Sequence, residues 1–145
     1  KEEEKKQQKK KKKRKKKNAL LLLLSLASCS NDDVPKDGDW DDIIQLSQDQ
    51  VLFGPGGGSA TITTEGQWWW VHGISLNGTD IDISGVDTTS DTFEVDGPGF
   101  TVRRENATEL YIEMAENQSG TERTLTVGLE AGDYFDGIVA IQSAN

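Results

Sequence analysis

The sequence is short of the residue types on which most enzyme chemistry depends. It has one cysteine and one histidine among 145 residues. A single cysteine forms no internal disulfide, and this pair is too small for a Cys/His metal cluster. Any Ser-His-acid or Cys-His arrangement would depend on His72 alone. We therefore expect no enzyme activity, no catalytic residues, no metal site and no cofactor.

Carboxylates, in contrast, are abundant. The chain has 25 Asp and Glu residues, so a glycan-active enzyme with paired acids stays open as a remote alternative. Most of these acids lie in polar linker and turn segments, where carboxylates are usually solvated and poorly suited to general-acid work. Residue type therefore leaves this alternative open without favouring it.

Basic residues are nearly absent outside the first 17 residues. The segment KEEEKKQQKKKKKRKKK has twelve of the 16 Lys and Arg residues and no apolar side chain. The apolar stretch NALLLLLSLA follows it and is too short to span a bilayer. A basic n-region at 1–17 and an apolar h-region at 18–28 together indicate a secretory signal peptide.

The signal peptide is predicted to end at an unusual site. The residues Leu26-Ala27-Ser28-Cys29 resemble the bacterial lipobox. The resemblance implies cleavage between Ser28 and Cys29 and attachment of acyl chains to Cys29, and each buried methylene of such chains adds about 0.8 kcal/mol of membrane affinity. A buried structural cysteine is the alternative. We expect a lipoprotein of the cell envelope, in the outer membrane, with its orientation left open.

Removal of residues 1–28 changes the charge of the protein. It takes away twelve of the 16 basic residues but only three of the 25 acidic ones, which leaves a net charge of −18. A phosphate backbone would be repelled by such a surface, so nucleic acid is excluded as a partner. Residues 29–42 are polar and acidic and read as a flexible tether. The acids after Cys29 also resemble the surface-export signal of Bacteroidetes lipoproteins, although solvated linker charge explains them equally.

Residues 43–145 show the two-residue periodicity of β-strands. In TELYIEM, Leu110, Ile112 and Met114 share one face, and RTLTVGLE, FTV and IVAIQ alternate in the same way. Clusters such as GPGGGS, NGTD and ENQSG separate the runs and indicate turns. Many short strands at this spacing, in about 100 residues, predict an all-β, immunoglobulin-like two-sheet sandwich.

Two stretches, LSQDQVLFGPGGGSATITTEGQWWWV and NQSGTERTLTVGLEAGDYFDGIVAIQ, carry a family resemblance. Together they resemble the BACON domain, an immunoglobulin-like module frequent in secreted and lipid-anchored Bacteroidetes proteins, over nearly all of residues 44–142. The resemblance implies glycan or mucin as the ligand class, and fold-holding roles for the matching positions. Those positions are Phe53, Gly56–Gly58, Trp69, Val71, Asn117, Gly120, Arg123 and Gln142.

Two departures from that family pattern stand out. The segment NGTDIDISGVDTTSDTFEVDGPG, residues 77–99, is longer and more acidic than the family leads us to expect. Its alternation predicts an extra hairpin, with Ile81 and Ile83 on one strand and Phe93 and Val95 on the other. Phe100 stands where the family often has a second tryptophan.

The triple WWW, Trp68 to Trp70, is the candidate ligand-binding feature. If Trp69 and Val71 face the core, strand alternation points Trp68 and Trp70 outward together, as a platform for a sugar ring. Packing under a loop is the alternative, and the strand could shift at Gly73 through a bulge that returns later residues to the core. An exposed pair would also suit a protein partner. Tyr134 and Phe135, expected in the loop before the last strand, are a second candidate.

The sequence thus predicts a lipid-anchored envelope protein with a non-catalytic, glycan-binding or spacer module. The alternative is a protein–protein or assembly component of the outer membrane that uses the tryptophan face.

Overall fold

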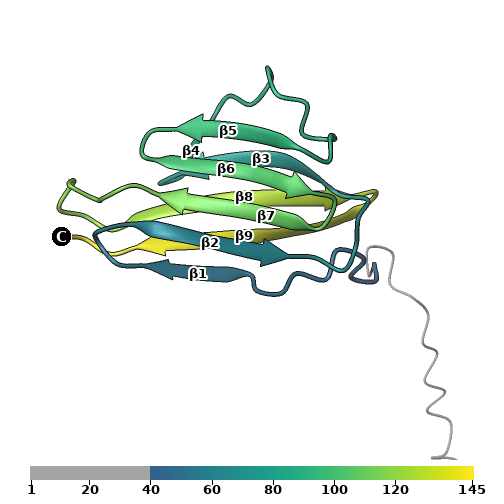
Figure 1. The fold of residues 1–145 in the computed structure, drawn as a ribbon, viewed down its shortest axis with the longest axis horizontal. Helices are drawn as coiled ribbons and strands as arrows, with labels where there is room; N and C mark the ends of the chain where they lie inside the picture. The colour runs from purple at the N-terminus through teal and green to yellow at the C-terminus, as the bar shows by residue number, and fades with distance from the viewer. Residues whose placement is uncertain (1–39) are drawn as a thin grey trace, which may run out of the picture. The chain divides into compact units, whose positions relative to one another are not determined.

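Alternation of apolar and polar residues produces strands throughout the described part of the chain, which is residues 40–145 of a computed structural model (Figure 1). The expected signal peptide, Cys29 and most of the tether lie outside these residues. The strands are β1 (Gln50–Phe53), β2 (Gly58–Thr63), β3 (Trp70–Leu76), β4 (Thr79–Asp80), β5 (Phe93–Gly97), β6 (Phe100–Asn106), β7 (Glu109–Met114), β8 (Arg123–Ala131) and β9 (Tyr134–Gln142). Within residues 40–145 no helix is long and apolar enough to cross a membrane.

The strands form two stacked sheets. One has the order β1-β9-β8-β3-β4 and the other the order β2-β7-β6-β5 (Figure 1). Neighbouring strands are antiparallel except β1 and β9, which run parallel. The β3-β8-β9 and β2-β7-β6 groups have the order of the C-F-G and B-E-D strands of immunoglobulin domains. The all-β sandwich predicted from the sequence is therefore confirmed.

The core lies between the sheets and is built by the inward residues of each strand. Leu110, Ile112 and Met114 of β7 are buried, as their alternation predicted. The inward residues of β8 face them from the other sheet, and each fully buried aliphatic side chain contributes about 1.5–3 kcal/mol. Those residues are Leu125, Val127 and Leu129.

The insert between β3 and β5 corrects one expectation. The predicted extra hairpin is wrong, because the only strand between Asn77 and Phe93 is the two-residue β4. Instead, Ile81, Ile83 and Val86 pack against the core without strand pairing. Three apolar contacts anchor this segment where a paired strand was expected, and β5 pairs with β6 instead.

A network of hydrogen bonds joins β9 to the turn between β1 and β2. This network agrees with the fold-holding roles expected for Arg123 and Gln142. Gln142 is fully buried, and its Nε2 donates to the carbonyl oxygens of Ala115 at 2.8 Å and Gly54 at 3.3 Å. Arg123 Nε donates to Gln142 Oε1 at 3.0 Å. Gly57, at φ +81°, lies so close to the Met114 carbonyl that a Cβ would collide with it. Glycine is therefore required at this turn.

Candidate functional site

Trp69 is the inward member of the tryptophan triple. Its side chain is only 2% exposed, and Val71 after it is equally buried. The indole N–H donates to Thr64 Oγ1 at 2.9 Å and to the Gly66 carbonyl at 3.1 Å. The expectation that Trp69 and Val71 face the core is confirmed.

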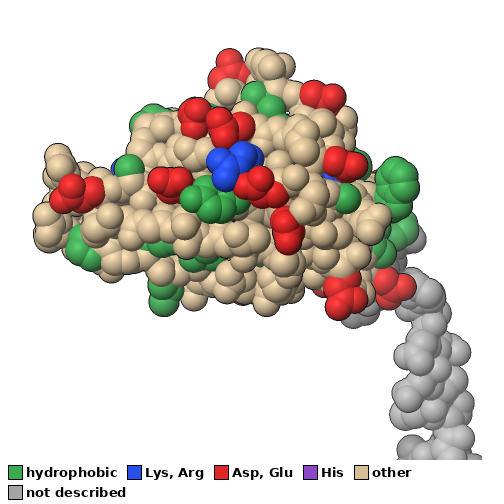
Figure 2. Space-filling view, viewed as in Figure 1, with side chains coloured by type: hydrophobic (Ala, Val, Ile, Leu, Met, Phe, Trp, Pro, Cys, Tyr) green, Lys and Arg blue, Asp and Glu red, His purple; other side chains and the backbone are tan. Residues whose placement is uncertain are grey.

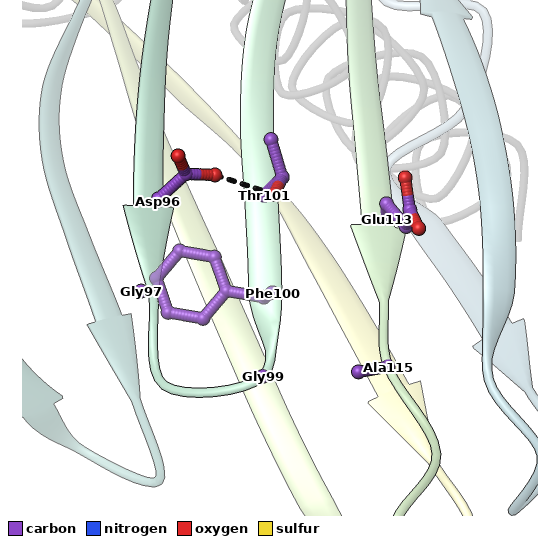
Figure 3. Close-up of a pocket in the computed structure, with 7 residues that line it drawn as sticks. All are labelled: Asp96, Gly97, Gly99, Phe100, Thr101, Glu113 and Ala115. Carbon is purple, nitrogen blue, oxygen red and sulfur yellow. Dashed lines mark hydrogen bonds between the residues drawn. The ribbon is translucent and has the colours of Figure 1, made fainter.

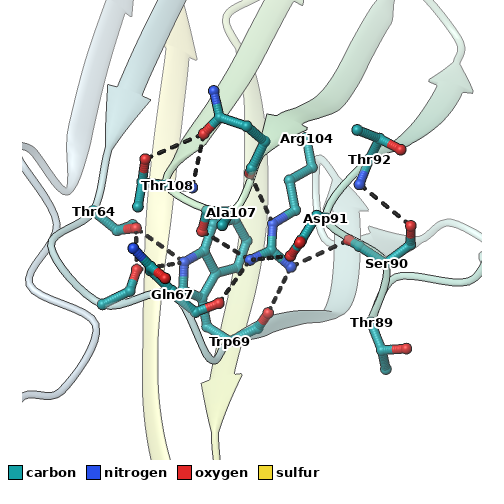
Figure 4. Close-up of polar contacts among 12 residues, drawn as sticks. Thr64, Gln67, Trp69, Thr89, Ser90, Asp91, Thr92, Arg104, Ala107 and Thr108 are labelled. Atoms are coloured by element: carbon teal, nitrogen blue, oxygen red, sulfur yellow. Dashed lines mark hydrogen bonds and ion pairs between the residues drawn. The ribbon is translucent and has the colours of Figure 1, made fainter.

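Arg104 holds Trp69 in place from the opposite sheet (Figure 4). Its guanidinium lies 3.8 Å from the centre of the indole ring and is 1% exposed. Burial lowers the pKa of Arg104, and the carboxylate of Asp91 at 3.8 Å partly offsets this. The five N–H groups of this arginine meet five backbone carbonyls, of Gln67, Trp69, Ser90, Asn106 and Ala107.

Sequence reasoning missed this arginine as a core residue. The signal was present in the alternation of β6, where Phe100 and Val102 precede Arg104 at two-residue intervals on the inward face. A cation at an inward position next to a buried tryptophan is a recognisable pattern.

Trp70 begins β3 and lies on the outer face of the five-stranded sheet. It pairs in register with Glu130 of β8, and Glu130 pairs with Phe135 of β9. Directly opposed residues of antiparallel strands project from the same face. The half-buried Trp70 and the 60%-exposed Phe135 therefore stand in one row across three strands.

Trp68 is placed differently from what the strand argument assumed. It is 90% exposed and precedes β3, which begins only at Trp70. The two-residue strand spacing that predicted a Trp68–Trp70 platform does not extend to Trp68. A joint platform of these two indoles stays a prediction, whereas Trp70 has structurally defined neighbours on the sheet.

His72 joins this face through a bulge. The pairing of β3 with β8 shifts between Val71 and Gly73, so His72 is the extra residue. Val71 and Ile74 are both buried as a result, which matches the bulge proposed at Gly73. The bulge also turns the imidazole onto the outer face, where it lies over Gly128, since a Cβ there would collide with the ring.

Phe135 contacts this imidazole edge to face, with ring centres 5.5 Å apart and planes at 87°. The sequence placed Tyr134 and Phe135 in a loop, and that placement is wrong because both belong to β9. The two-residue connection after Ala131 is short enough for β9 to start at Tyr134. Phe135 thus becomes part of the sheet surface.

A shallow hollow of about 170 Å³ opens beside His72, and we call it the His72 trough. Gly73 leaves part of its floor without a side chain, while the imidazole of His72 lies over Gly128. Ser75 pairs in register with both Thr126 and Asp80, which supplies hydroxyl and carboxylate groups at the far side. The residues lining the trough are His72, Gly73, Ile74, Ser75, Asp80, Thr126 and Gly128.

A second hollow, of about 300 Å³, lies on the four-stranded sheet (Figure 3). Thr101 stands between the acids Asp96 and Glu113 and donates to Asp96 at 2.7 Å. The aromatic ring of this region, Phe100, is 4% exposed. The second hollow therefore offers carboxylates without an exposed ring for a ligand to stack on.

The outer face of the four-stranded sheet is dominated by charge, and Figure 2 shows basic atoms set among acidic side chains there. Arg103 is ion-paired with Glu94 at 3.3 Å and with Glu105 at 2.6 Å, and its guanidinium lies 4.5 Å from the Tyr111 ring centre. These carboxylates raise the pKa of Arg103 through hydrogen bonds. Across residues 40–145, no three His, Cys, Asp or Glu side chains form a group that could hold a metal ion.

The sequence matches no protein-family model and no curated protein. Among solved structures, the fold is similar to that of a protein from Bacteroides thetaiotaomicron determined by NMR. The TM-score is 0.57 at 23% identity, over 72% of this chain and 89% of that one. A titin M4 domain is a much weaker match, with a TM-score of 0.39 at 9% identity over 70% of this chain and 91% of that one. The first likeness shows a shared fold.

Proposed function

We propose that this protein is a non-catalytic, BACON-like carbohydrate-binding lipoprotein of the cell envelope, and that the His72 trough and its aromatic row form the glycan site. The observation that carries the proposal is the row of Trp70 and Phe135, with His72 against Phe135, beside a hollow lined by hydroxyls and a carboxylate. Sugars are bound by aromatic faces that cover their C–H surfaces, with polar groups near by for their hydroxyls.

The trough suits a sugar chain better than a compact small molecule. It is open along the sheet and small, so it would bury only part of a ligand at a time. Gly73 keeps the floor low beside the His72 imidazole, between the aromatic row and the hydroxyls of Ser75 and Thr126. An extended ligand could therefore lie across the strands and touch both sides.

The assignment to BACON-like lipoproteins rests on the sequence. The order of the glycine turn, Arg123 and Gln142 along the chain supports the assignment to this family. The hydrogen bonds among these residues agree with the structural roles that the resemblance implies. Anchoring rests on the lipobox resemblance at Cys29. A Cys29→Ala variant should move from the membrane fraction to the soluble fraction, and continued retention in membranes would contradict the anchor.

A glycan array with the purified protein tests the binding function. Trp70→Ala and Phe135→Ala should each weaken any glycan binding by about fivefold to tenfold, because a stacking contact is worth about 1–1.4 kcal/mol. Tyr111→Ala is the matched control, since it removes an aromatic ring from the opposite sheet. Equal loss in all three variants, or no glycan bound by the unmodified protein, would contradict the proposal.

One observation favours a protein partner as a second candidate function. Trp68 is 90% exposed, and the nearby Ile43, whose carbonyl lies against Gly66, is 54% exposed. Exposed tryptophans of this kind dominate contact hot spots. Trp68→Ala should then reduce cross-linking to an envelope protein while glycan binding is unchanged, and the reverse result would assign Trp68 to the glycan site.

A further inference from the structure

We infer that the His72 trough selects uncharged glycans and rejects glycans that carry sulfate or carboxylate groups. This inference rests on the proposed function and specifies its ligand class. It depends on which charges the fold places on each face, and these are fixed by the strand register.

The first step is the location of the positive charges. The described residues include three arginines, and each is engaged elsewhere. Arg103 forms ion pairs on the outer face of the four-stranded sheet, and Arg104 is buried beneath Trp69. Arg123 has the inward register of Leu125 on β8 and donates to Gln142 and to the Ala115 carbonyl. The outer face of the five-stranded sheet therefore has no arginine or lysine among residues 40–145.

The second step is the negative charge at the trough. Asp80 lines it, and Glu130 stands between Trp70 and Phe135 in the aromatic row. Sulfate and carboxylate groups are normally bound by charge-assisted donors such as arginine. Here an anionic sugar would meet two carboxylates instead, each opposing it by about 1 kcal/mol at 4 Å in water.

The same two carboxylates suit a neutral sugar. An ionised carboxylate accepts hydrogen bonds through two oxygens, and a pyranose offers pairs of adjacent hydroxyl donors. Asp80 belongs to the short edge strand β4, is exposed, and lies opposite Ser75. The carboxylate and the Ser75 hydroxyl can therefore serve neighbouring hydroxyls of one sugar ring.

Gly73 provides a way to block the trough without disturbing the fold. Apart from its two chain neighbours, a Cβ at Gly73 would meet no heavy atom within 4 Å, so a side chain there would project into open space. The residue lines the trough directly. Gly73→Val should therefore fill the binding space while leaving the core register intact. Gly85→Val, also in open space but in the insert, is the matched control.

The experiment compares neutral polysaccharides with their chemically sulfated forms, using the whole protein. The probes are laminarin, dextran and β-mannan, each plain and sulfated, measured in about 50 mM and about 200 mM salt. We expect at least one plain polysaccharide to bind, and its sulfated form to bind about tenfold or more weakly, with the gap narrowing in high salt. Asp80→Lys should further reduce the difference in affinity between the plain and the sulfated form.

The outcomes separate this inference from the function on which it rests. If a sulfated form binds as tightly as its plain form at low salt, and Gly73→Val abolishes both, the trough is a glycan site and the selectivity is overturned. If no polysaccharide binds, or if Gly73→Val and Gly85→Val bind as the unmodified protein does, the glycan site itself is refuted. If Gly73→Val loses glycan binding, Gly85→Val keeps it and the unmodified protein prefers the plain polysaccharide, both the glycan site and its selectivity are supported.

Discussion

Arg104 gives the most decisive test of how this fold positions its tryptophans. Replacing it by methionine keeps most of the side-chain length and its packing against Trp69, but removes the charge and all five N–H donors. The carbonyls of Gln67, Trp69, Ser90, Asn106 and Ala107 then lose their partner at once.

The expected cost can be estimated from the burial of each bond. The bond to the Trp69 carbonyl, at 2.9 Å, is fully buried, and leaving such an acceptor unsatisfied costs about 1–3 kcal/mol. The other four bonds are partly buried, so water can replace much of what they lose. Loss of the desolvated cation–π contact at 3.8 Å adds about 1–2 kcal/mol. We expect a total loss of about 3 kcal/mol in the free energy of unfolding, a large share of the roughly 5–15 kcal/mol typical of a domain.

The assay is urea unfolding followed by near-ultraviolet circular dichroism, which reports on the packing of Trp69. Arg104→Lys is the intermediate case, because an ammonium keeps the charge but has three donors and cannot reach five carbonyls. Arg103→Met is the matched control on the same strand, where the guanidinium is exposed and its ion pairs are screened. The urea concentration at the unfolding midpoint should be highest for Arg103→Met, lower for Arg104→Lys and lowest for Arg104→Met.

Two results would refute this reasoning. One is an Arg104→Met variant within about 1 kcal/mol of the parent protein, which would mean that the relief of burying a charge offsets the lost bonds. The other is an equal loss of unfolding free energy in Arg103→Met, which would mean that the change in net charge causes the effect. A further check is hydrogen exchange in residues 81–92, because Arg104 Nη1 also donates to the Ser90 carbonyl at 3.2 Å.

Three further predictions concern other parts of the fold. Gln142→Leu should lower the free energy of unfolding in urea by about 1–3 kcal/mol, because the carbonyls of Gly54 and Pro55 lose a buried donor, whereas Gln118→Leu on the surface should not. Burial and then the carboxylates of Asp136 and Asp42 raise the pKa of Tyr134 above its ordinary value of 10, so its contribution to stability is present below pH 10 and lost as the pH rises through the folded value. Ultraviolet absorbance titration should show a late-ionising phenol that Tyr134→Phe removes. Deletion of His72 should leave cooperative unfolding intact and abolish glycan binding, whereas deletion of Ile74 should unfold the domain. If both deletion variants are unfolded, the interpretation of His72 as the extra residue of a bulge is contradicted.

Much of the sandwich could be predicted because the information is local. The inward positions of β7 and β8 follow from two-residue alternation, which needs no knowledge of the partner strand. The turn at Asn77 and Gly78 was also predictable, since both residues adopt positive φ and Asn-Gly is the preferred sequence for such a hairpin. Fold-holding roles for Arg123 and Gln142 were also expected, whereas the hydrogen bond between the two side chains was not.

The candidate site was harder to predict because it depends on register between distant segments. Trp70 and Phe135 are neighbours only because both pair with strand β8, through Glu130. Nothing in the local sequence fixes which residue of β9 stands opposite Glu130. The prediction of a loop at Phe135 was wrong because the connection after Ala131 is only two residues long. The prediction of a hairpin in the insert between β3 and β5 was wrong for a different reason. Ile81 and Ile83 alternate as residues of a strand do, but they are partly buried by contacts with the core and not by strand pairing.

The bulge at His72 explains why the core and the candidate site can share one strand. A regular strand that buries Val71 would bury Gly73 and expose Ile74. The extra residue reverses the alternation once, so Val71 and Ile74 both reach the core while Trp70, His72 and the open side of Gly73 all belong to the outer face. The core gains an isoleucine in place of a glycine, and the surface gains an imidazole beside a glycine floor. One insertion therefore accounts for both the packing of β3 and the shape of the trough, and because the bulge residue itself carries no core contact, the surface can change at His72 without a change of register beneath it.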